Sequence, residues 1–324
     1  MHRVGLAGLG YWGPKLARNL DALAELAWLC DLSPELRSSF APQYPRARVT
    51  ESFAEMLADP ALEAIVVATP VVTHYELAKQ ALLAGKHVFV EKPPALAAAE
   101  VEELVAIAEE RSLVLLPGHL LLYHPAVRKL KELIDARELG DVLYLYGNRQ
   151  NLGQIRQDEN ALWSLGVHDL SVILHLVGEE PSEAWARGES FLNAGVEDVV
   201  FCYLRFPSGV VAHMHLSWLD PQKMRRMTVV GKEKMAVFDD MEPEHKITLF
   251  DKGPEAPRSS GYRGTRTGDI HMPRVSNEEP LKLECKHFLA LVSGEGDPHA
   301  AARDGVAVVR ALEGLQSSLE RAPA

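Results

Sequence analysis

The chain has 324 residues, and a typical size of about 100–200 residues per domain predicts two domains. It carries 34 Lys and Arg against 45 Asp and Glu, so its formal net charge is −11. This balance argues against nucleic acid or an anionic membrane as the main partner, because both require a basic surface. With 47% hydrophobic residues, each domain can bury a core of its own.

The three cysteines, Cys30, Cys202 and Cys285, stand far apart with no CxxC spacing. We therefore expect free thiols of a reducing compartment rather than a disulfide framework. No apolar run approaches the roughly 20 residues of a membrane span, and no signal peptide is visible after Met1. These features predict a soluble, cytoplasmic protein.

The first 120 residues alternate short apolar strands with capped helices. The strand candidates are Val4–Ala7, Leu26–Cys30, Ala47–Thr50, Ala64–Ala68, His87–Val90 and Val114–Leu116. Their nearly continuous apolar character is typical of a parallel sheet covered on both faces. Helix starts are marked at Ser33 and by S/T-x-x-E capping boxes at Ser52 and Thr73, and Gly85 marks a helix end. The alternation predicts a doubly wound α/β Rossmann domain over residues 1–120.

Residues 121–302 follow another pattern, which predicts a domain for substrate binding and oligomerisation. Helices are expected over Pro125–Ala136 and Ala161–Val177, with an irregular stretch, Arg149–Asn160, between them. The strand candidates are Val142–Tyr146, Glu183–Phe191, Asp198–Phe206, Val210–Trp218, Arg226–Val230, Met235–Asp239 and Lys246–Phe250. Neighbouring strands with period-two alternation predict an α+β domain with a large, mostly antiparallel open sheet and the long helix on one face.

The open sheet has two usable faces. Within Val210–Trp218, Ala212 and Met214 point to one side, whereas His213 and His215 point to the other. Helices can cover one face only, so we expect another subunit to cover the second. This predicts a homodimer or homotetramer formed through the open sheet face.

The C-terminal part is expected to be a long loop followed by two helices. The segment Lys252–Asn277 is rich in Gly, Pro, Arg and Ser, which predicts a loop that is functional or mobile. Helices are expected near Glu278–Val292 and Arg303–Arg321.

A G-x-G-x-x-G motif follows the first strand directly. Gly8 permits a tight turn, Gly10 lets the backbone approach a pyrophosphate, and Gly13 allows close packing of helix on strand. The helix that follows offers free N–H groups and a positive dipole end to the phosphates. Asp31 ends the second strand, where it can bind the ribose hydroxyls and would repel a 2′-phosphate. The motif in this context favours NAD over NADP as the cofactor.

Two further motifs carry a family resemblance. Ala68-Thr69-Pro70 is followed by His74, and Glu91-Lys92-Pro93 ends the fifth strand. With the glycine motif, they resemble the Gfo/Idh/MocA oxidoreductase family over essentially the whole chain. The resemblance implies that Lys92 projects beside the nicotinamide and that His168, from the long helix of the second domain, faces it. It also implies that the last helix packs back on the nucleotide domain. The implied cofactor-binding residues are Gly8, Gly10, Tyr11, Trp12, Gly13, Asp31, Thr69, Pro70, His74, Glu91 and Lys92.

Within that family the chain looks most like the bacterial UDP-N-acetylglucosaminuronate 3-dehydrogenases. The segments that carry this likeness include Gly10–Pro14, Gly118-His119, Asn160–Trp163, Gly166–Asp169, Gly268–Ile270 and Glu279–Leu281 with Glu284 and His287-Phe288. One position departs from the family pattern, because Ser164 stands where an Asp four residues before the catalytic His is usual. A hydroxyl can bond the imidazole, but it cannot stabilise an imidazolium as a carboxylate does.

The chemistry expected of these residues is oxidation of a secondary alcohol. NAD supplies the hydride acceptor. His168 is the candidate base, since a pKa of about 6.5 suits proton transfer near neutrality. Lys92 would stabilise negative charge on the alcohol oxygen, or act as the base if burial lowers its pKa. A surface lysine and a core histidine are the alternative interpretations.

The candidate substrate-binding residues lie next to His168 in the sequence. They are Tyr123, Arg149, Asn151, Arg156, Asn160, Trp163 and His168 itself. Arg suits bidentate contacts with a carboxylate or diphosphate, and the aromatic rings could stack on a sugar or base. A solvated loop or a core position would explain them equally. His213 and His215 have no third ligand at a fitting spacing, so no metal is expected.

The leading hypothesis is an NAD-dependent sugar dehydrogenase that acts on C3 of a UDP-N-acetyl-hexuronate or a related sugar nucleotide. One alternative is a dehydrogenase of a free cyclitol or sugar. Another is a non-catalytic NAD or sugar sensor on the same fold, which Ser164 would favour.

Overall fold

The computed structural model describes residues 1–153, 155–157, 159–257 and 263–321. The chain divides into two compact units. Unit 1 comprises Met1–Tyr123 and Glu278–Arg310, and unit 2 comprises His124–Asn277 and Ala311–Ala324. In the described part of the chain, no helix is both long and apolar enough to cross a bilayer.

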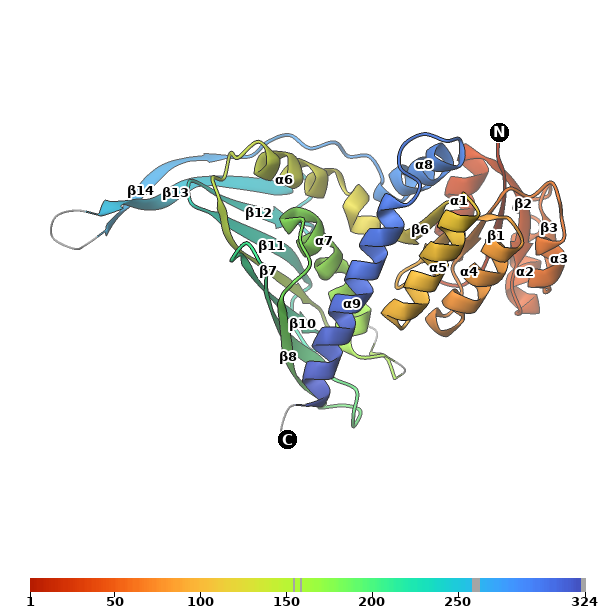
Figure 1. The fold of residues 1–324 in the computed structure, drawn as a ribbon, viewed down its shortest axis with the longest axis horizontal. Coiled ribbons are helices and arrows are strands. Elements are labelled where there is room, and N and C mark those ends of the chain that lie inside the picture. The colour runs from red at the N-terminus through yellow and green to blue at the C-terminus, as the bar shows by residue number, and fades with distance from the viewer. Residues whose placement is uncertain (154, 158, 258–262, 322–324) are drawn as a thin grey trace. The chain divides into compact units, whose positions relative to one another are not determined.

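Unit 1 is built on a six-stranded sheet with the order β3-β2-β1-β4-β5-β6 (Figure 1). Its strands are β1 Arg3–Ala7, β2 Glu25–Cys30, β3 Arg48–Thr50, β4 Ala64–Val67, β5 His87–Glu91 and β6 Leu115–Gly118. All neighbours are parallel. Because the strand order reverses between β1 and β4, a ligand crevice is expected at the carboxyl ends of these strands. The predicted doubly wound α/β sheet is confirmed.

Helices flank this sheet, and most begin where the sequence predicts. They are α1 Gly13–Leu23, α2 Pro34–Phe40, α3 Phe53–Leu57, η1 Val71–Thr73, α4 His74–Leu83, α5 Ala98–Glu110, η2 Leu120–Tyr123, α8 Pro280–Val292 and the first half of α9 Ala300–Glu320. The side chains of Ser33 and Ser52 cap α2 and α3. The predicted cap at Thr73 is wrong, because its hydroxyl donates to the Pro70 carbonyl oxygen instead.

The boundary between the units differs from the expected one at residue 120, because α8 joins unit 1. Cys285 and Phe288 lie in the same apolar cluster as Val4, Phe89 and Leu116. The rings of Phe89 and Phe288 meet edge to face, with 5.8 Å between centroids. Burial of apolar surface thus places α8 in unit 1, although the sequence predicted it within the domain of residues 121–302.

The first half of α9 also belongs to unit 1. A Cβ atom at Gly305 would lie 2.7 Å from Cγ of Pro117, so the helix passes close to the end of β6. Arg310 forms an ion pair with Glu102 on α5. The second half of the helix belongs to unit 2, so the predicted packing on the nucleotide domain applies to the first half only.

Unit 2 contains an eight-stranded sheet with the order β14-β13-β12-β11-β7-β10-β9-β8. Its strands are β7 Val142–Gln150, β8 Glu183–Glu189, β9 Val199–Arg205, β10 Val211–Ser217, β11 Met224–Gly231, β12 Met235–Asp239, β13 Ile247–Pro257 and β14 Arg263–His271. Only the β7–β10 pair is parallel among these described neighbours. The predicted mostly antiparallel sheet is confirmed.

One face of this sheet is covered by helices α6 Pro125–Asp135 and α7 Val167–Val177 and by the end of α9 (Figure 1). Ala186 on β8 donates its backbone N–H to the hydroxyl oxygen of Ser318 on α9 at 3.1 Å. The other face carries stacked rings, such as Trp185 on Tyr203 and Phe201 on His215. Trp185 and Phe201 are 48% and 49% exposed within the chain.

The predicted loop over Lys252–Asn277 is wrong for most of its length. Strands β13 and β14 pair there as an antiparallel hairpin, which extends as a ribbon from the rest of the unit 2 sheet (Figure 1). Gly253 and Pro254 hid the strand pattern, yet both have partners in β14, Arg266 and Thr265. Backbone pairing does not depend on apolar alternation, which explains the difference. Residues 258–262 of the expected loop lie outside the described residues.

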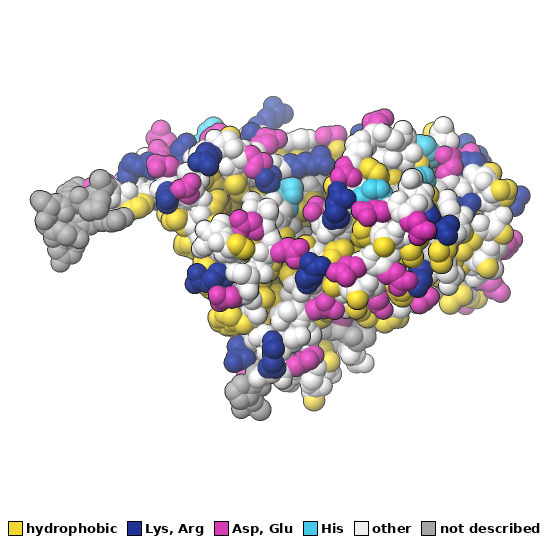
Figure 2. Space-filling model, in the orientation of Figure 1, with side chains coloured by type: hydrophobic (Ala, Val, Ile, Leu, Met, Phe, Trp, Pro, Cys, Tyr) yellow, Lys and Arg dark blue, Asp and Glu magenta, His cyan; other side chains and the backbone are white. Residues whose placement is uncertain are grey.

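Basic and acidic side chains are interspersed on the face of the molecule that Figure 2 shows.

Candidate active site

The glycine-rich turn between β1 and α1 has the geometry of a dinucleotide loop. Gly8 has a φ of +95°, and a Cβ atom there would lie 2.4 Å from the Ala68 carbonyl oxygen, so glycine is required. No described atom lies within 4 Å of a Cβ built at Gly10, which leaves room for a ligand beside the backbone. At Gly13 the Cβ would lie 3.1 Å from the Gly8 carbonyl oxygen, in keeping with close helix packing.

Asp31, directly after β2, holds this turn in place. Its Oδ2 accepts the backbone N–H of Leu9 at 2.7 Å, and its Oδ1 accepts that of Ser33 at 2.8 Å. Each carboxylate oxygen can accept a further hydrogen bond. Asp31 therefore fits both tasks, ordering the turn and accepting from ribose hydroxyl groups, and the turn with this carboxylate fits the adenosine half of NAD.

Two aromatic rings and a lysine lie at the start of α1. The ammonium of Lys15 is 4.1 Å from the ring centroid of Tyr11 and 4.2 Å from that of Trp12. Tyr11 is largely exposed, whereas Trp12 is half-buried against the core. Sequence analysis selected the two rings but missed Lys15, although its position two residues after the last glycine was a usable signal. The cluster places a cation in the first turn of the helix.

His74 links the loops that follow β4 and β5. Its Nδ1 lies 2.8 Å from the Pro93 carbonyl oxygen, and its Nε2 lies 2.8 Å from that of Thr69. The ring is buried, and burial lowers its pKa, with the charge of Lys92 acting in the same direction. The structure therefore places His74 between the two loops, where it acts on their backbone.

β5 ends at Glu91, and Lys92 follows it at the carboxyl edge of the sheet. The backbone N–H of Lys92 donates to Oε2 of Glu91 at 3.3 Å, and the peptide bond to Pro93 is cis. Burial raises the pKa of Glu91 to about 7, and the charges of Lys92 and Lys15 oppose this shift. A Cβ atom at Gly118 would lie 3.3 Å from the same Oε2, so this glycine makes room for the carboxyl group.

Tyr123, expected to bind substrate, lies in the interior of unit 1. Its hydroxyl is 2.8 Å from Nδ1 of His287 on α8, and the two rings pack at 5.6 Å. Its exposed fraction is 6%. Through the contact with His287, the tyrosine links η2 to α8. Nearby in the sequence, burial lowers the pKa of His119 to about 4, with Lys92 adding to the effect.

His168 lies in the first turn of α7 in unit 2 and is half-buried. The chain before it, Leu162–Gly166, is π-helical rather than α-helical. Such wider turns occur mostly at functional sites. Because Ser164 lies inside the π-helical segment, its spacing to His168 is not that of a regular α-helical turn, which the sequence analysis had assumed.

Arg149 forms a buried ion pair with Asp169, the neighbour of His168. Oδ1 of Asp169 accepts from Nε of Arg149 at 2.9 Å and from Nη2 at 2.7 Å. Both side chains are less than 10% exposed. The expected irregular stretch from Arg149 is thus partly wrong, because β7 continues to Gln150 and directs Arg149 toward α7.

Asn160 and Trp163 belong to a polar network at the start of η3. Oδ1 of Asn160 accepts the backbone N–H of Trp163 at 3.2 Å, and Nδ2 donates to Glu197 at 2.7 Å and to Gln316 at 3.0 Å. Trp163 donates from its indole to Gln316 at 3.2 Å. A pocket of about 280 Å³ in unit 2 is lined by Asn160, Trp163 and Gln316 among other residues.

Asn151 and Arg156 differ from these buried residues. Asn151 is half-buried and donates its backbone N–H to Ser217 at 3.1 Å. Arg156 is paired with Glu159 at 2.9 Å, and its side chain is 45% exposed. Of the two predicted substrate-binding arginines, Arg149 is buried and Arg156 lies at the surface.

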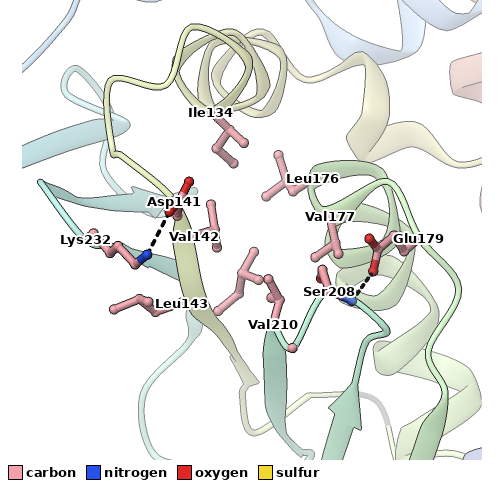
Figure 3. Close-up of a pocket in the computed structure, with 12 residues that line it drawn as sticks. Ile134, Asp141, Val142, Leu143, Leu176, Val177, Glu179, Ser208, Val210 and Lys232 are labelled. Atoms are coloured by element: carbon pink, nitrogen blue, oxygen red, sulfur yellow. Dashed lines mark hydrogen bonds and ion pairs between the residues drawn. The ribbon is translucent and has the colours of Figure 1, made fainter.

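A larger pocket of about 460 Å³ lies elsewhere in unit 2 and contains none of the predicted site residues. Figure 3 shows apolar side chains of α6, α7, β7 and the segment before β10 around it, with the Asp141–Lys232 ion pair on one side and Glu179 on the other. In the described part of the chain, no cluster of three His, Cys, Asp or Glu side chains could hold a metal. His213 and His215 stack on Tyr146 and Phe201 instead.

Two family models match this chain. The model described as "Oxidoreductase family, NAD-binding Rossmann fold" matches residues 2–119, and the model of the GFO/IDH/MocA C-terminal domain matches residues 127–237. Together they cover well over half of the sequence. The chain belongs to the Gfo/Idh/MocA oxidoreductase family. It is therefore an NAD-binding oxidoreductase, as the glycine motif, Asp31 and the Glu91-Lys92-Pro93 motif predicted.

Three relatives show the range of this family. The UDP-N-acetylglucosamine 3-dehydrogenase of Acidithiobacillus ferrooxidans is 28% identical over 96% of this chain and 94% of its own, and its structure superposes with a TM-score of 0.83. The myo-inositol 2-dehydrogenase of Thermotoga maritima is 25% identical over 98% of this chain and 96% of its own. The structure of GenD2 from gentamicin A biosynthesis, in complex with NAD, is 26% identical, covers 99% of this chain and 94% of its own, and has a TM-score of 0.81.

Proposed function

We propose that this member of the Gfo/Idh/MocA family oxidises a secondary hydroxyl of a sugar nucleotide, at C3 of a UDP-N-acetyl-hexuronate or a related sugar. The observation that carries the proposal is the match to the UDP-N-acetylglucosamine 3-dehydrogenase, which spans both units of the chain. Arg156 supports a substrate with negative charge, since its side chain is 45% exposed and a guanidinium bonded to Glu159 through Nε has further N–H donors for an anion.

In this proposal, NAD would supply the hydride acceptor when bound, and side chains of this protein take up the proton. His168 takes the proton of the substrate hydroxyl as a general base. Lys92 stabilises the negative charge that develops in the reaction. Asp31 and the turn at Gly8–Gly13 would hold the adenosine and diphosphate parts of the cofactor, since the carboxylate orders the turn and Gly10 leaves its backbone open.

Other expected site residues take indirect roles. Arg149 positions α7, and with it His168, through the ion pair with Asp169. His74 positions the segment after Lys92 through the Pro93 carbonyl. Arg156 and Asn151 are the side chains proposed to contact the substrate itself.

Turnover assays with purified enzyme and NAD would test the proposal. UDP-N-acetylglucosaminuronate, UDP-N-acetylglucosamine and myo-inositol are offered in parallel, and reduced nicotinamide is followed by its absorbance. We expect turnover with a sugar nucleotide and none with the free cyclitol. Turnover of myo-inositol alone would favour the second candidate, a cyclitol dehydrogenase, which the relative from Thermotoga maritima supports.

A single-turnover experiment distinguishes the enzyme from a non-catalytic sensor. The sensor alternative would be favoured by Ser164, which stands where an Asp is expected. An enzyme reduces one equivalent of NAD in the wild type and much less in Lys92→Ala. Binding of NAD and sugar nucleotide without reduction in the wild type would identify a sensor.

We also propose that the exposed face of the unit 2 sheet joins subunits into a homodimer or homotetramer. Exposed Phe201 and Trp185 support this, because large apolar patches mark interaction surfaces. Light scattering of Phe201→Glu should show a smaller assembly than the wild type. An unchanged mass would contradict the proposal.

A further inference from the structure

Lys15 is a cation near the glycine-rich turn that the proposed function does not use. It lies in the first turn of α1 and is half-buried. Its ammonium group is 4.1 Å from the ring centroid of Tyr11 and 4.2 Å from that of Trp12. Among the described residues, no carboxylate forms an ion pair with this ammonium group. A cation without a counter-ion at a partly buried position favours the binding of an anion.

The turn ahead of α1 adds three backbone donors to this cation. The N–H groups of Gly10, Tyr11 and Trp12 make no hydrogen bond to any residue that the structure describes. Those on either side are occupied, because Leu9 and Gly13 donate theirs at 2.7 and 3.1 Å. No side chain caps α1, and its first turn contains no acidic residue. The start of this helix therefore offers N–H groups, a positive dipole end and an ammonium group to one ligand.

The space beside these donors suits a diphosphate. No described atom lies within 4 Å of a Cβ atom built at Gly10, so a ligand can approach the backbone there. The family model that matches residues 2–119 is that of an NAD-binding domain, and the diphosphate is the anionic part of NAD. The nicotinamide ring of NAD is positively charged, and its adenosine is neutral. Charge therefore favours the diphosphate, rather than either end of the cofactor, as the ligand of Lys15.

Tyr11 and Trp12 restrict where the Lys15 ammonium group can lie. The two rings meet edge to face, with 6.0 Å between their centroids, and the ammonium group packs against both. Tyr11 is 81% exposed, so its ring gains little from burial and is available for this contact. A free lysine side chain loses rotamer entropy when it binds a ligand. A lysine that two rings already hold loses less, so the rings prepare it for an anion.

We propose that Lys15 binds the diphosphate of the cofactor and that Tyr11 and Trp12 position its ammonium group for this contact. Because dissolved ions screen such charges, the contact makes the affinity for the cofactor fall as the salt concentration rises. The inference deepens the cofactor-binding part of the proposed function and rests on that part alone. It does not depend on the sugar substrate, on His168 or on Lys92.

Binding of three ligands to the full-length protein tests the contact. Isothermal titration calorimetry measures the Kd for NAD and for ADP-ribose, which share the diphosphate, and ligand-observed NMR measures it for adenosine, which lacks one. Lys15→Met should raise the Kd for NAD and ADP-ribose about tenfold and leave that for adenosine unchanged. Lys79→Met is the matched control and should keep the wild-type values, because Lys79 also packs on a tyrosine ring of unit 1, 5.1 Å from the centroid of Tyr75.

Three other patterns of binding would each overturn the proposal. An unchanged Kd for NAD in Lys15→Met would show that the lysine makes no contact with the cofactor. Equal weakening of all three ligands, adenosine included, would indicate a structural role of Lys15 in the turn. Weaker binding of NAD with unchanged binding of ADP-ribose would place Lys15 at the nicotinamide end.

Two further variants separate the charge of Lys15 from its position. Lys15→Arg keeps the charge and should bind NAD within about twofold of the wild type. Tyr11→Leu removes one ring, so the Kd for NAD should rise about threefold while its salt dependence stays that of the wild type. In Lys15→Met, the Kd should vary less than in the wild type between about 0.05 and 0.5 M salt.

Two results would refute the charge contact. One is a loss of affinity in Lys15→Arg as large as that in Lys15→Met, and the other is an equal salt dependence in Lys15→Met and the wild type. All these measurements follow cofactor binding without substrate or turnover. Failure of this inference is therefore distinct from failure of the proposed dehydrogenase activity.

Discussion

The two units use buried polar side chains in different ways. In unit 1, Asp31 and His74 bond the backbone of loops at the carboxyl edge of the sheet. In unit 2, the polar groups around α7 bond one another, as Arg149 does with Asp169. The first arrangement orders main chain around space for a ligand, whereas the second orders the helix that carries His168. Polar residues near a catalytic position can therefore support it without contacting substrate.

Of the substitutions that test this comparison of the two units, one at Lys92 should have the largest effect, a loss of kcat. Lys92→Ala should lower kcat about 10³-fold, because it removes the group that we propose stabilises the developing negative charge. Lys282→Ala, at an exposed lysine on α8, is the control and should keep the wild-type kcat. If Lys92→Ala kept nearly the full kcat, Lys92 would have no part in the chemical step.

The contrast between the units also explains what could be predicted from the sequence. The parallel sheet, the glycine turn and Asp31 were predictable because each motif demands one backbone conformation with one spacing. Arg149 and Tyr123 were not, because Arg and Tyr look the same in a sequence whether they face a ligand or a buried partner. The hairpin of β13 and β14 was missed because its strands pair through the backbone without an alternating apolar pattern. The helix α8 was assigned to the second domain because it follows that domain in the sequence, whereas its apolar side chains pack in the core of unit 1.

In unit 2 the buried ion pair should matter most for stability. Arg149→Met leaves Asp169 charged and unpaired in the interior, which costs about 3–5 kcal/mol. Thermal unfolding should show a marked fall in Tm. Arg205→Met is the matched control, since Arg205 lies on the same sheet in an exposed pair with Glu183 and should change Tm little. A stable Arg149→Met protein would show that the pair is dispensable.

In unit 1 the corresponding stability effect depends on pH. The pKa of Glu91 is raised to about 7, so between pH 4.5 and 7 the folded chain binds a proton that the unfolded chain has lost. The contribution of Glu91 to stability is therefore fully present below this window and is lost, by up to about 3 kcal/mol, as the pH rises through it. Urea unfolding of the wild type should show this fall, and Glu91→Gln should lack that part of it. Equal pH dependence in both proteins would contradict the raised pKa.

Cofactor affinity offers a test of the loop-ordering role. Asp31→Asn removes the charge that accepts the N–H groups of Leu9 and Ser33, so the Kd for NAD should rise about 30-fold, equivalent to about 2 kcal/mol. Isothermal titration calorimetry measures it. Asp59→Asn removes a carboxylate that accepts from the Trp28 indole in the same unit and should leave the Kd unchanged.

The smallest effect is expected at the start of η3. Asn160→Ala removes the side chain that accepts the Trp163 N–H and should lower the free energy of unfolding by about 1 kcal/mol. Chemical denaturation is precise enough to detect it. Asn193→Ala is the control, because the interaction of Asn193 with Val196 uses its backbone carbonyl and survives the substitution. If Asn160→Ala lost affinity for the substrate but kept its stability, Asn160 would be a residue that contacts the substrate.

The late position of α8 in the chain has a consequence during protein synthesis. Phe89 and Leu116 leave the ribosome long before Phe288, the residue that covers them in the finished core. The intervening segment takes on the order of ten seconds to translate, so the nascent first unit waits with an open apolar surface. Until α8 is made, this exposed apolar surface is prone to aggregation.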